Sequence, residues 1–147
     1  HYYERTLPAR DDSTWDFSKW IPQVVVVNVG MNNFALADPG EERYVRLYTA
    51  LVRRIRQVYP KAFIVCALGP MLTDIYPEGH HNLTLARRYM KDAVAKLQTD
   101  GDKNVALVEF PEQKHSNGLG CGFHPSAKTH QLMADQLVAL LEEKLGW

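Results

Sequence analysis

The sequence is poor in cysteine, has no excess of charge and contains no long apolar run. Its 147 residues include two cysteines, Cys66 and Cys121, without a Cys-x-x-Cys pair or a zinc-binding spacing. Lys and Arg total 17, and so do Asp and Glu, so no basic field attracts phosphates and we expect no nucleic-acid partner. The longest apolar run, from Val24, is too short to cross a bilayer, and the first residues lack an apolar signal core, so we expect no membrane partner.

Hydrophobic residues make up 46% of the chain, which is enough for the core of one domain over residues 1–147. Short β-branched or apolar runs alternate with amphipathic helical patterns. The runs cover residues 23–30, 62–69 and 104–110, and the helical patterns cover residues 41–59, residues 83–97 and the stretch after Ser126. Runs that are apolar on both faces, each followed by a helix, predict an α/β fold with a parallel sheet and helices on both faces.

Ligands and catalytic groups of such folds gather beyond the carboxyl ends of the strands. The segments there are "GMNNFA" after the first run, "GPMLTD" after the second and "PEQKHSNGLGCGFHP" after the third. A sheet of three strands is small for a domain with helices on both faces. The first 20 residues have no clear periodicity, and we expect them to pack over an existing surface.

The segment after the first run combines a turn glycine, Gly30, with Asn32 and Asn33. An asparagine amide at a strand end carries two N–H donors, which suits a site where negative charge develops on a carbonyl oxygen. Asn and Gly are also the commonest turn formers, so a purely structural turn is the competing interpretation.

His124 stands directly before Pro125, which restricts the histidine backbone to extended geometry, and Ser126 can cap the helix that follows. A histidine held in this way can take a proton from a nucleophile and return it to a leaving group. No acid lies just upstream, because Cys121, Gly122 and Phe123 occupy those positions. Asp74, Glu109 or a backbone carbonyl could orient the imidazole instead.

Other polar and aromatic residues allow weaker predictions. His80, His81, His115, Asp74 and Glu78 lack a metal-ligand spacing, and we expect no metal. Phe34, Tyr76 and Phe123 lie in loops that we expect to form the site, where aromatic rings can stack on a sugar. Cys66 and Cys121 are both expected at the carboxyl edge of the sheet, either bridged or as two buried free thiols.

"VVVVNVGMNNF", followed much later by "GFHPSAKTHQLMADQL", resembles the third and fifth sequence blocks of the SGNH, or GDSL-type, hydrolases. Within that family, "WDFSKWIPQVVVVNVGMNNF", "CALGPML" and "HPSAKTHQLMA" are similar to carbohydrate esterase family two. The resemblance implies a flavodoxin-like three-layer sandwich and a secreted or periplasmic esterase that removes acetyl groups from carbohydrate or small esters without a cofactor. It makes Asn32 the oxyanion donor, Gly30 the turn that admits it, and His124 the general base.

Three departures from the family pattern accompany this resemblance. Asn33 replaces the usual Asp of the turn, and Cys121 replaces the Asp three residues before the histidine. The Gly-Asp-Ser block is absent, and no serine here follows a buried strand and opens a helix. We therefore expect the chain to be the C-terminal part of a larger hydrolase whose remaining N-terminal part carries the nucleophile.

Two other functions compete with the esterase. A catalytically inactive carbohydrate-binding or scaffold domain could use the same fold, since a fold does not fix a function. A phosphate or nucleotide binder would need a glycine-rich loop after the first strand, where "GMNNFA" supplies one glycine.

Overall fold

The computed structural model describes residues 2–34 and 37–147. Three strands form a parallel sheet in the order β1 (Val24–Val27), β2 (Phe63–Leu68), β3 (Val105–Glu109). The register places Val25 opposite Ile64 and Val65 opposite Ala106. Each strand leads into a long helix: α1 (Glu41–Val58), α2 (Asn82–Thr99) and α3 (Ala127–Leu145). The predicted α/β order is therefore confirmed.

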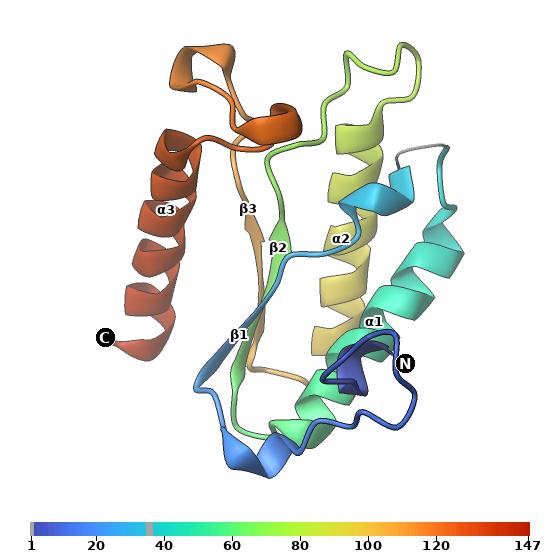
Figure 1. Ribbon diagram of the computed structural model, residues 1–147, viewed down its shortest axis with the longest axis vertical. Helices are drawn as coiled ribbons and strands as arrows, with labels where there is room; N and C mark the ends of the chain where they lie inside the picture. Colours follow the sequence, from blue (N-terminus) through green and yellow to red (C-terminus); the bar gives the residue numbers. More distant parts are fainter. Residues whose placement is uncertain (1, 35–36) are drawn as a thin grey trace.

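Helices cover both faces of the sheet (Figure 1), with α1 and α2 on one face and α3 on the other. The central strand β2 is buried along its whole length, and its side chains alternate between the two cores. Ile64, Cys66 and Leu68 pack on the α1 and α2 side, while Phe63, Val65 and Ala67 pack on the α3 side. This two-sided burial explains why the run of β2 is apolar at every position.

The strand β1 is less buried than its sequence suggests. It pairs with β2 along one edge only, within the described part of the chain. Val24 and Val25 are partly exposed, Val26 is 41% exposed, and Val27 is buried. The apolar run of β1 therefore predicts that its valine side chains are buried, whereas the described residues leave three of them partly exposed.

As expected, the N-terminal segment packs over the surface of the domain. Two of its aromatic residues, Tyr3 and Phe17, make this contact near the end of α1. Short 3₁₀ turns at η1 (Tyr2–Glu4) and η2 (Phe17–Lys19) bring Tyr3 onto Phe17, with ring centroids 5.5 Å apart. Phe17 meets Tyr59 edge-on at 5.6 Å. None of the described helices is long and apolar enough to cross a membrane.

Candidate active site

Three loops meet at the carboxyl end of the sheet (Figure 1). The 3₁₀ turn η3 (Met31–Phe34) follows β1, residues 69–81 follow β2, and residues 110–126 follow β3. The last loop contains the 3₁₀ turns η4 (His115–Asn117) and η5 (Cys121–Phe123). The three segments predicted to carry chemistry therefore share one edge of the sheet.

His124 has the backbone conformation that Pro125 imposes, with φ −69° and ψ 163°. Ser126 is the N-cap of α3, and its hydroxyl oxygen accepts a hydrogen bond from the Thr129 N–H at 3.2 Å. The same hydroxyl donates to the Asn117 carbonyl at 2.7 Å, which ties the helix start to the preceding loop. The predicted cap at Ser126 is confirmed.

The imidazole of His124 is oriented by a backbone carbonyl. Its Nδ1 lies 3.0 Å from the carbonyl oxygen of Cys121. A carbonyl can only accept, so the neutral imidazole carries its proton on Nδ1 and leaves the Nε2 lone pair open. Because the residue is exposed, Nε2 is accessible to a nucleophile or a substrate.

The two carboxylates that could have oriented the imidazole are engaged elsewhere. Asp74 accepts from the Thr84 N–H at 2.9 Å, and Glu109 accepts from Arg87 Nε at 2.7 Å. Of the three alternatives for the orienting group, the structure therefore selects the carbonyl.

Gly30 holds the turn after β1 in a conformation that favours glycine. Its φ is +106°, and a Cβ at this position would clash with the Tyr44 hydroxyl. The Asn33 N–H donates to the Gly30 carbonyl at 3.1 Å and closes the turn. Asn32 is exposed, and its side chain forms no hydrogen bond with residues 2–34 or 37–147.

A residue that sequence reasoning missed supports this turn from below. Asn82 is buried at the start of α2, and its Nδ2 donates to the Phe34 carbonyl at 3.2 Å. A polar side chain at the start of a helix usually bonds to the backbone of that helix. The sequence around Asn82 therefore gives no sign that its amide bonds to Phe34.

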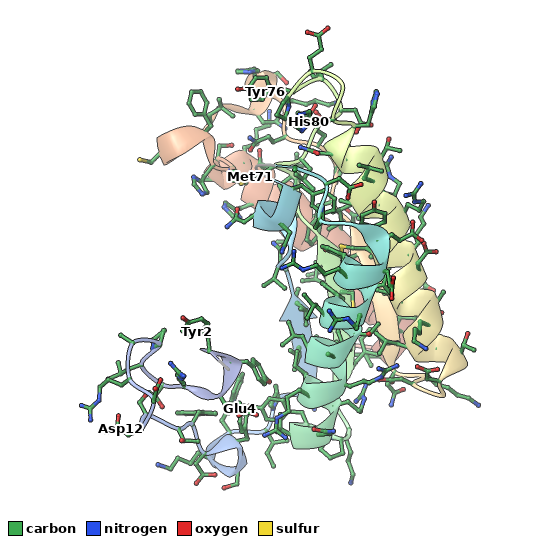
Figure 2. All side chains as sticks on the ribbon, turned by 90° about the vertical axis from the view of Figure 1, so that its right-hand side faces the viewer. Tyr2, Glu4, Asp12, Met71, Tyr76 and His80 are labelled. Carbon is green, nitrogen blue, oxygen red and sulfur yellow. The ribbon has the colours of Figure 1, made fainter. Side chains whose placement is uncertain are left out.

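The three aromatic candidates for substrate binding have different positions. Phe34 is fully buried, with its ring 5.5 Å from that of Tyr44 and 5.9 Å from that of Tyr89, so its prediction as a substrate contact is wrong. It is a core residue between α1 and α2. Tyr76 and Phe123 are 78% and 74% exposed. Figure 2 shows Tyr76 and His80 on the loop at the site end of the molecule, far from Tyr2 and Glu4 at the other end.

The two cysteines are free, so the predicted bridge is wrong, and the alternative of two buried free thiols holds for Cys66 but not for the exposed Cys121. Cys66 lies within β2 rather than at its end and is completely buried, whereas Cys121 is exposed in the histidine loop. The two thiols therefore neither form a bridge nor share a buried site. Burial raises the pKa of the Cys66 thiol to about 11, so this thiol stays protonated and unreactive at neutral pH.

Metal ligands do not gather around the site. Across residues 2–34 and 37–147, no three His, Cys, Asp or Glu side chains are placed to hold an ion. His80, His81 and His115 are exposed, and Asp74 is bonded to Thr84.

A parallel α/β sheet with an oriented imidazole and a turn amide at its carboxyl edge is a framework for acyl transfer. Residues 3–132 match the model of the GDSL-like lipase/acylhydrolase family, and the chain belongs to this family. The resemblance to SGNH, or GDSL-type, hydrolases is thereby confirmed.

Individual relatives refine this placement. The cellulase/esterase CelE of Acetivibrio thermocellus is 43% identical over 145 residues, which cover 99% of this chain and 17% of CelE. An acetylxylan esterase / glucomannan deacetylase of Cellvibrio japonicus is 29% identical over 145 residues, covering 92% of this chain and 37% of that protein. The solved structure of a family two carbohydrate esterase from Clostridium thermocellum in complex with cellohexaose is 42% identical, with a TM-score of 0.90, over 99% of this chain and 43% of that one. The chain thus spans less than half of each relative.

Proposed function

We propose that this chain is part of a serine esterase that removes acetyl groups from carbohydrate esters. The observation that carries the proposal is the His124 imidazole, which donates from Nδ1 to the Cys121 carbonyl and keeps Nε2 open. Asn32 is exposed on the turn after β1 at the same edge of the sheet. The similarity to an acetylxylan esterase and to a family two carbohydrate esterase supports acetyl removal in particular.

In the proposed reaction, a serine hydroxyl attacks the ester carbonyl while Nε2 of His124 accepts its proton. The Asn32 amide and backbone N–H groups stabilise the oxyanion of the tetrahedral intermediate. Collapse of this intermediate breaks the bond to the sugar oxygen, which takes the proton from His124. Water, activated by the same imidazole, then attacks the acetyl-enzyme and releases acetate and the free serine.

We propose that the serine nucleophile lies on residues outside this chain. Ser126 is engaged as the cap of α3, and Ser18 donates to the Asp16 carboxylate at 2.7 Å. Ser13 and Ser18 belong to the N-terminal segment at the opposite end of the sheet (Figure 1). The unpaired side of β1 offers a place for further parallel strands. A serine at the carboxyl end of such a strand would lie at the same end of the sheet as His124.

The exposed rings of Tyr76 and Phe123 are our candidates for sugar contacts. Aromatic faces stack on the apolar faces of sugar rings, and these two rings stand on neighbouring loops of the site. We infer a polysaccharide substrate, in keeping with the cellohexaose bound by the relative from Clostridium thermocellum. Such polymers lie outside the cell, so we also propose that the protein is exported.

The test is His124→Ala in the full-length protein. We expect kcat for an aryl acetate to fall by about 10²- to 10⁴-fold, because the base that activates the serine is lost. His115→Ala is the matched control, since His115 is an exposed histidine of the same loop whose side chain makes no hydrogen bond with the described residues. It should keep kcat within about twofold.

Near-normal turnover of His124→Ala would reject the esterase mechanism. A full-length wild-type protein that binds cellohexaose but hydrolyses no acetyl ester would instead favour the inactive carbohydrate-binding domain.

A further inference from the structure

Gln113 connects the end of the sheet to the loop that carries His124. It lies in the segment after β3, and its backbone N–H donates to the Pro70 carbonyl beyond the end of β2 at 2.9 Å. Its side-chain Nε2 donates to the Phe123 carbonyl, also at 2.9 Å. One residue therefore links the exits of two strands to the residue directly before His124.

The turn around Phe123 needs such a link. Gly122 and Phe123 both have positive φ values, 58° and 63°, and this conformation is unfavourable for a phenylalanine. The Phe123 ring is mostly exposed, so packing of the side chain does little to hold the turn. Conformations of this kind persist where the surrounding structure fixes them.

The other hydrogen bonds of residues 120–124 stay within the loop. The Gly120 N–H donates to the His124 carbonyl at 2.7 Å, and the His124 N–H donates to the Cys121 carbonyl at 3.2 Å. Among the residues that the structure describes, the Gln113 amide makes the hydrogen bond that joins residues 120–124 to the start of the loop after β3, which is itself held at Pro70 just beyond the end of β2.

The orientation of the Gln113 amide follows from its partner. The Phe123 carbonyl can only accept, so the NH₂ group faces it and Oε1 points the other way. Oε1 is buried and has no hydrogen-bond partner among residues 2–34 and 37–147. A buried unpaired acceptor lowers stability, so an apolar side chain of the same length would lose the hydrogen bond to Phe123 but also remove this destabilising group.

We propose that Gln113 is a positioning residue for the His124 imidazole, an inference that rests on the proposed esterase function. By holding the Phe123 carbonyl, the amide fixes the turn that contains Cys121, whose own carbonyl holds Nδ1 of His124. The direction of Nε2 is thus set by Gln113, which is anchored at Pro70 beyond the end of β2, through two carbonyls of one short turn. Small errors in the placement of a catalytic group are costly, because the reacting atoms must be held close together and aligned.

The decisive variant is Gln113→Met in the full-length protein, which keeps the length of the side chain and removes both the donor and the unpaired acceptor. We expect kcat for an aryl acetate to fall by about tenfold to a hundredfold, with KM changed by less than about twofold. The melting temperature should change little, because the lost hydrogen bond is offset by the removal of the buried acceptor.

Gln136→Met is the matched control. Gln136 lies on α3, and its Nε2 donates to the carbonyl of Glu109, at the end of β3, at 3.0 Å. This variant loses the same kind of bond at the same edge of the sheet without touching the histidine loop, so its kcat should match wild type.

The outcomes separate this inference from the proposed function. Normal kcat in Gln113→Met, together with an inactive His124→Ala, overturns the positioning role and leaves the esterase standing. A Gln113→Met protein that only melts earlier, with normal kcat well below its melting temperature, overturns it as well. If Gln113→Met does not fold, Gln113→Glu replaces it, because a carboxylate of the same shape cannot donate to the Phe123 carbonyl at neutral pH and should show the same loss of kcat.

Discussion

Cys121 acts on His124 through its backbone, while its side chain is exposed. Cys121→Ser keeps the carbonyl, so we expect kcat for an aryl acetate to stay within about twofold of wild type. Cys121→Asp places a carboxylate where the family usually has one, and it should gain little because Nδ1 already has an acceptor. Steady-state kinetics of both variants check this. A loss of more than about tenfold in Cys121→Ser would mean that the thiol itself takes part.

The residues of the site differ in how far the sequence predicts them. Pro125 and Ser126 have strong local preferences, and they predict both the extended backbone of His124 and the start of α3. The orienting group of His124 cannot be singled out, because every residue has a carbonyl. The prediction for Phe34 is wrong because an aromatic residue in a loop gives the same sequence signal whether its ring packs inward or outward.

The helices and strands themselves follow from local patterns, except at their ends. The expected strand over residues 23–30 is Val24–Val27 in the structure, because Gly30 and the turn of η3 draw the chain out of the sheet. The start of α2 has no local signal, since its N-cap residue His81 makes no side-chain cap. Its first turn is capped by Asp74, ten residues upstream in the loop after β2, which no pattern of adjacent residues reveals.

This remote cap makes α2 dependent on Asp74. The carboxylate accepts from both the N–H and the hydroxyl of Thr84. Asp74→Ala should lower the free energy of unfolding by about 1 kcal/mol at neutral pH, measured by urea denaturation. Glu78→Ala, which removes an exposed carboxylate of the same loop, serves as the control and should change it by less than about 0.5 kcal/mol.

The effect of Asp74 should also depend on pH. Burial raises the pKa of its carboxyl, but the hydrogen bonds from Thr84 outweigh this, and the pKa lies below its ordinary value. A carboxyl whose pKa is lowered by folding stabilises the folded state above its ordinary pKa and loses this effect as the pH falls through the folded pKa. The difference in stability between wild type and Asp74→Ala should therefore shrink in acid. A constant difference from neutral pH down to strong acid would contradict this role.

The two faces of the sheet are not equally covered by helices. The face of the sheet that carries α1 and α2 is covered. On the opposite face, α3 packs on β2 and β3 and leaves β1 less covered. Along β1, a pocket of about 570 Å³ is lined in part by Val24, Val25 and Val26. Unpaired strand edges and exposed apolar side chains promote association with other chain segments. The open edge therefore fits the proposal that further strands complete this sheet.

Substitution of Val26 tests this proposal in the isolated chain and in the full-length protein. Strand alternation places it on the same face as Val24, and it is 41% exposed. The 147-residue chain prepared alone should self-associate through this edge, as measured by sedimentation equilibrium, and Val26→Lys should reduce the association because a lysine blunts an exposed strand edge. In the full-length protein the same substitution should lower the free energy of unfolding by about 2 kcal/mol or more, because there the segments proposed to extend the sheet also cover this face of β1 and bury the added charge. Leu7→Lys, at an exposed position of the N-terminal segment, should do neither. A full-length protein that tolerates Val26→Lys as well as Leu7→Lys would show that this face of β1 stays open, and the serine would then have to reach His124 by another route.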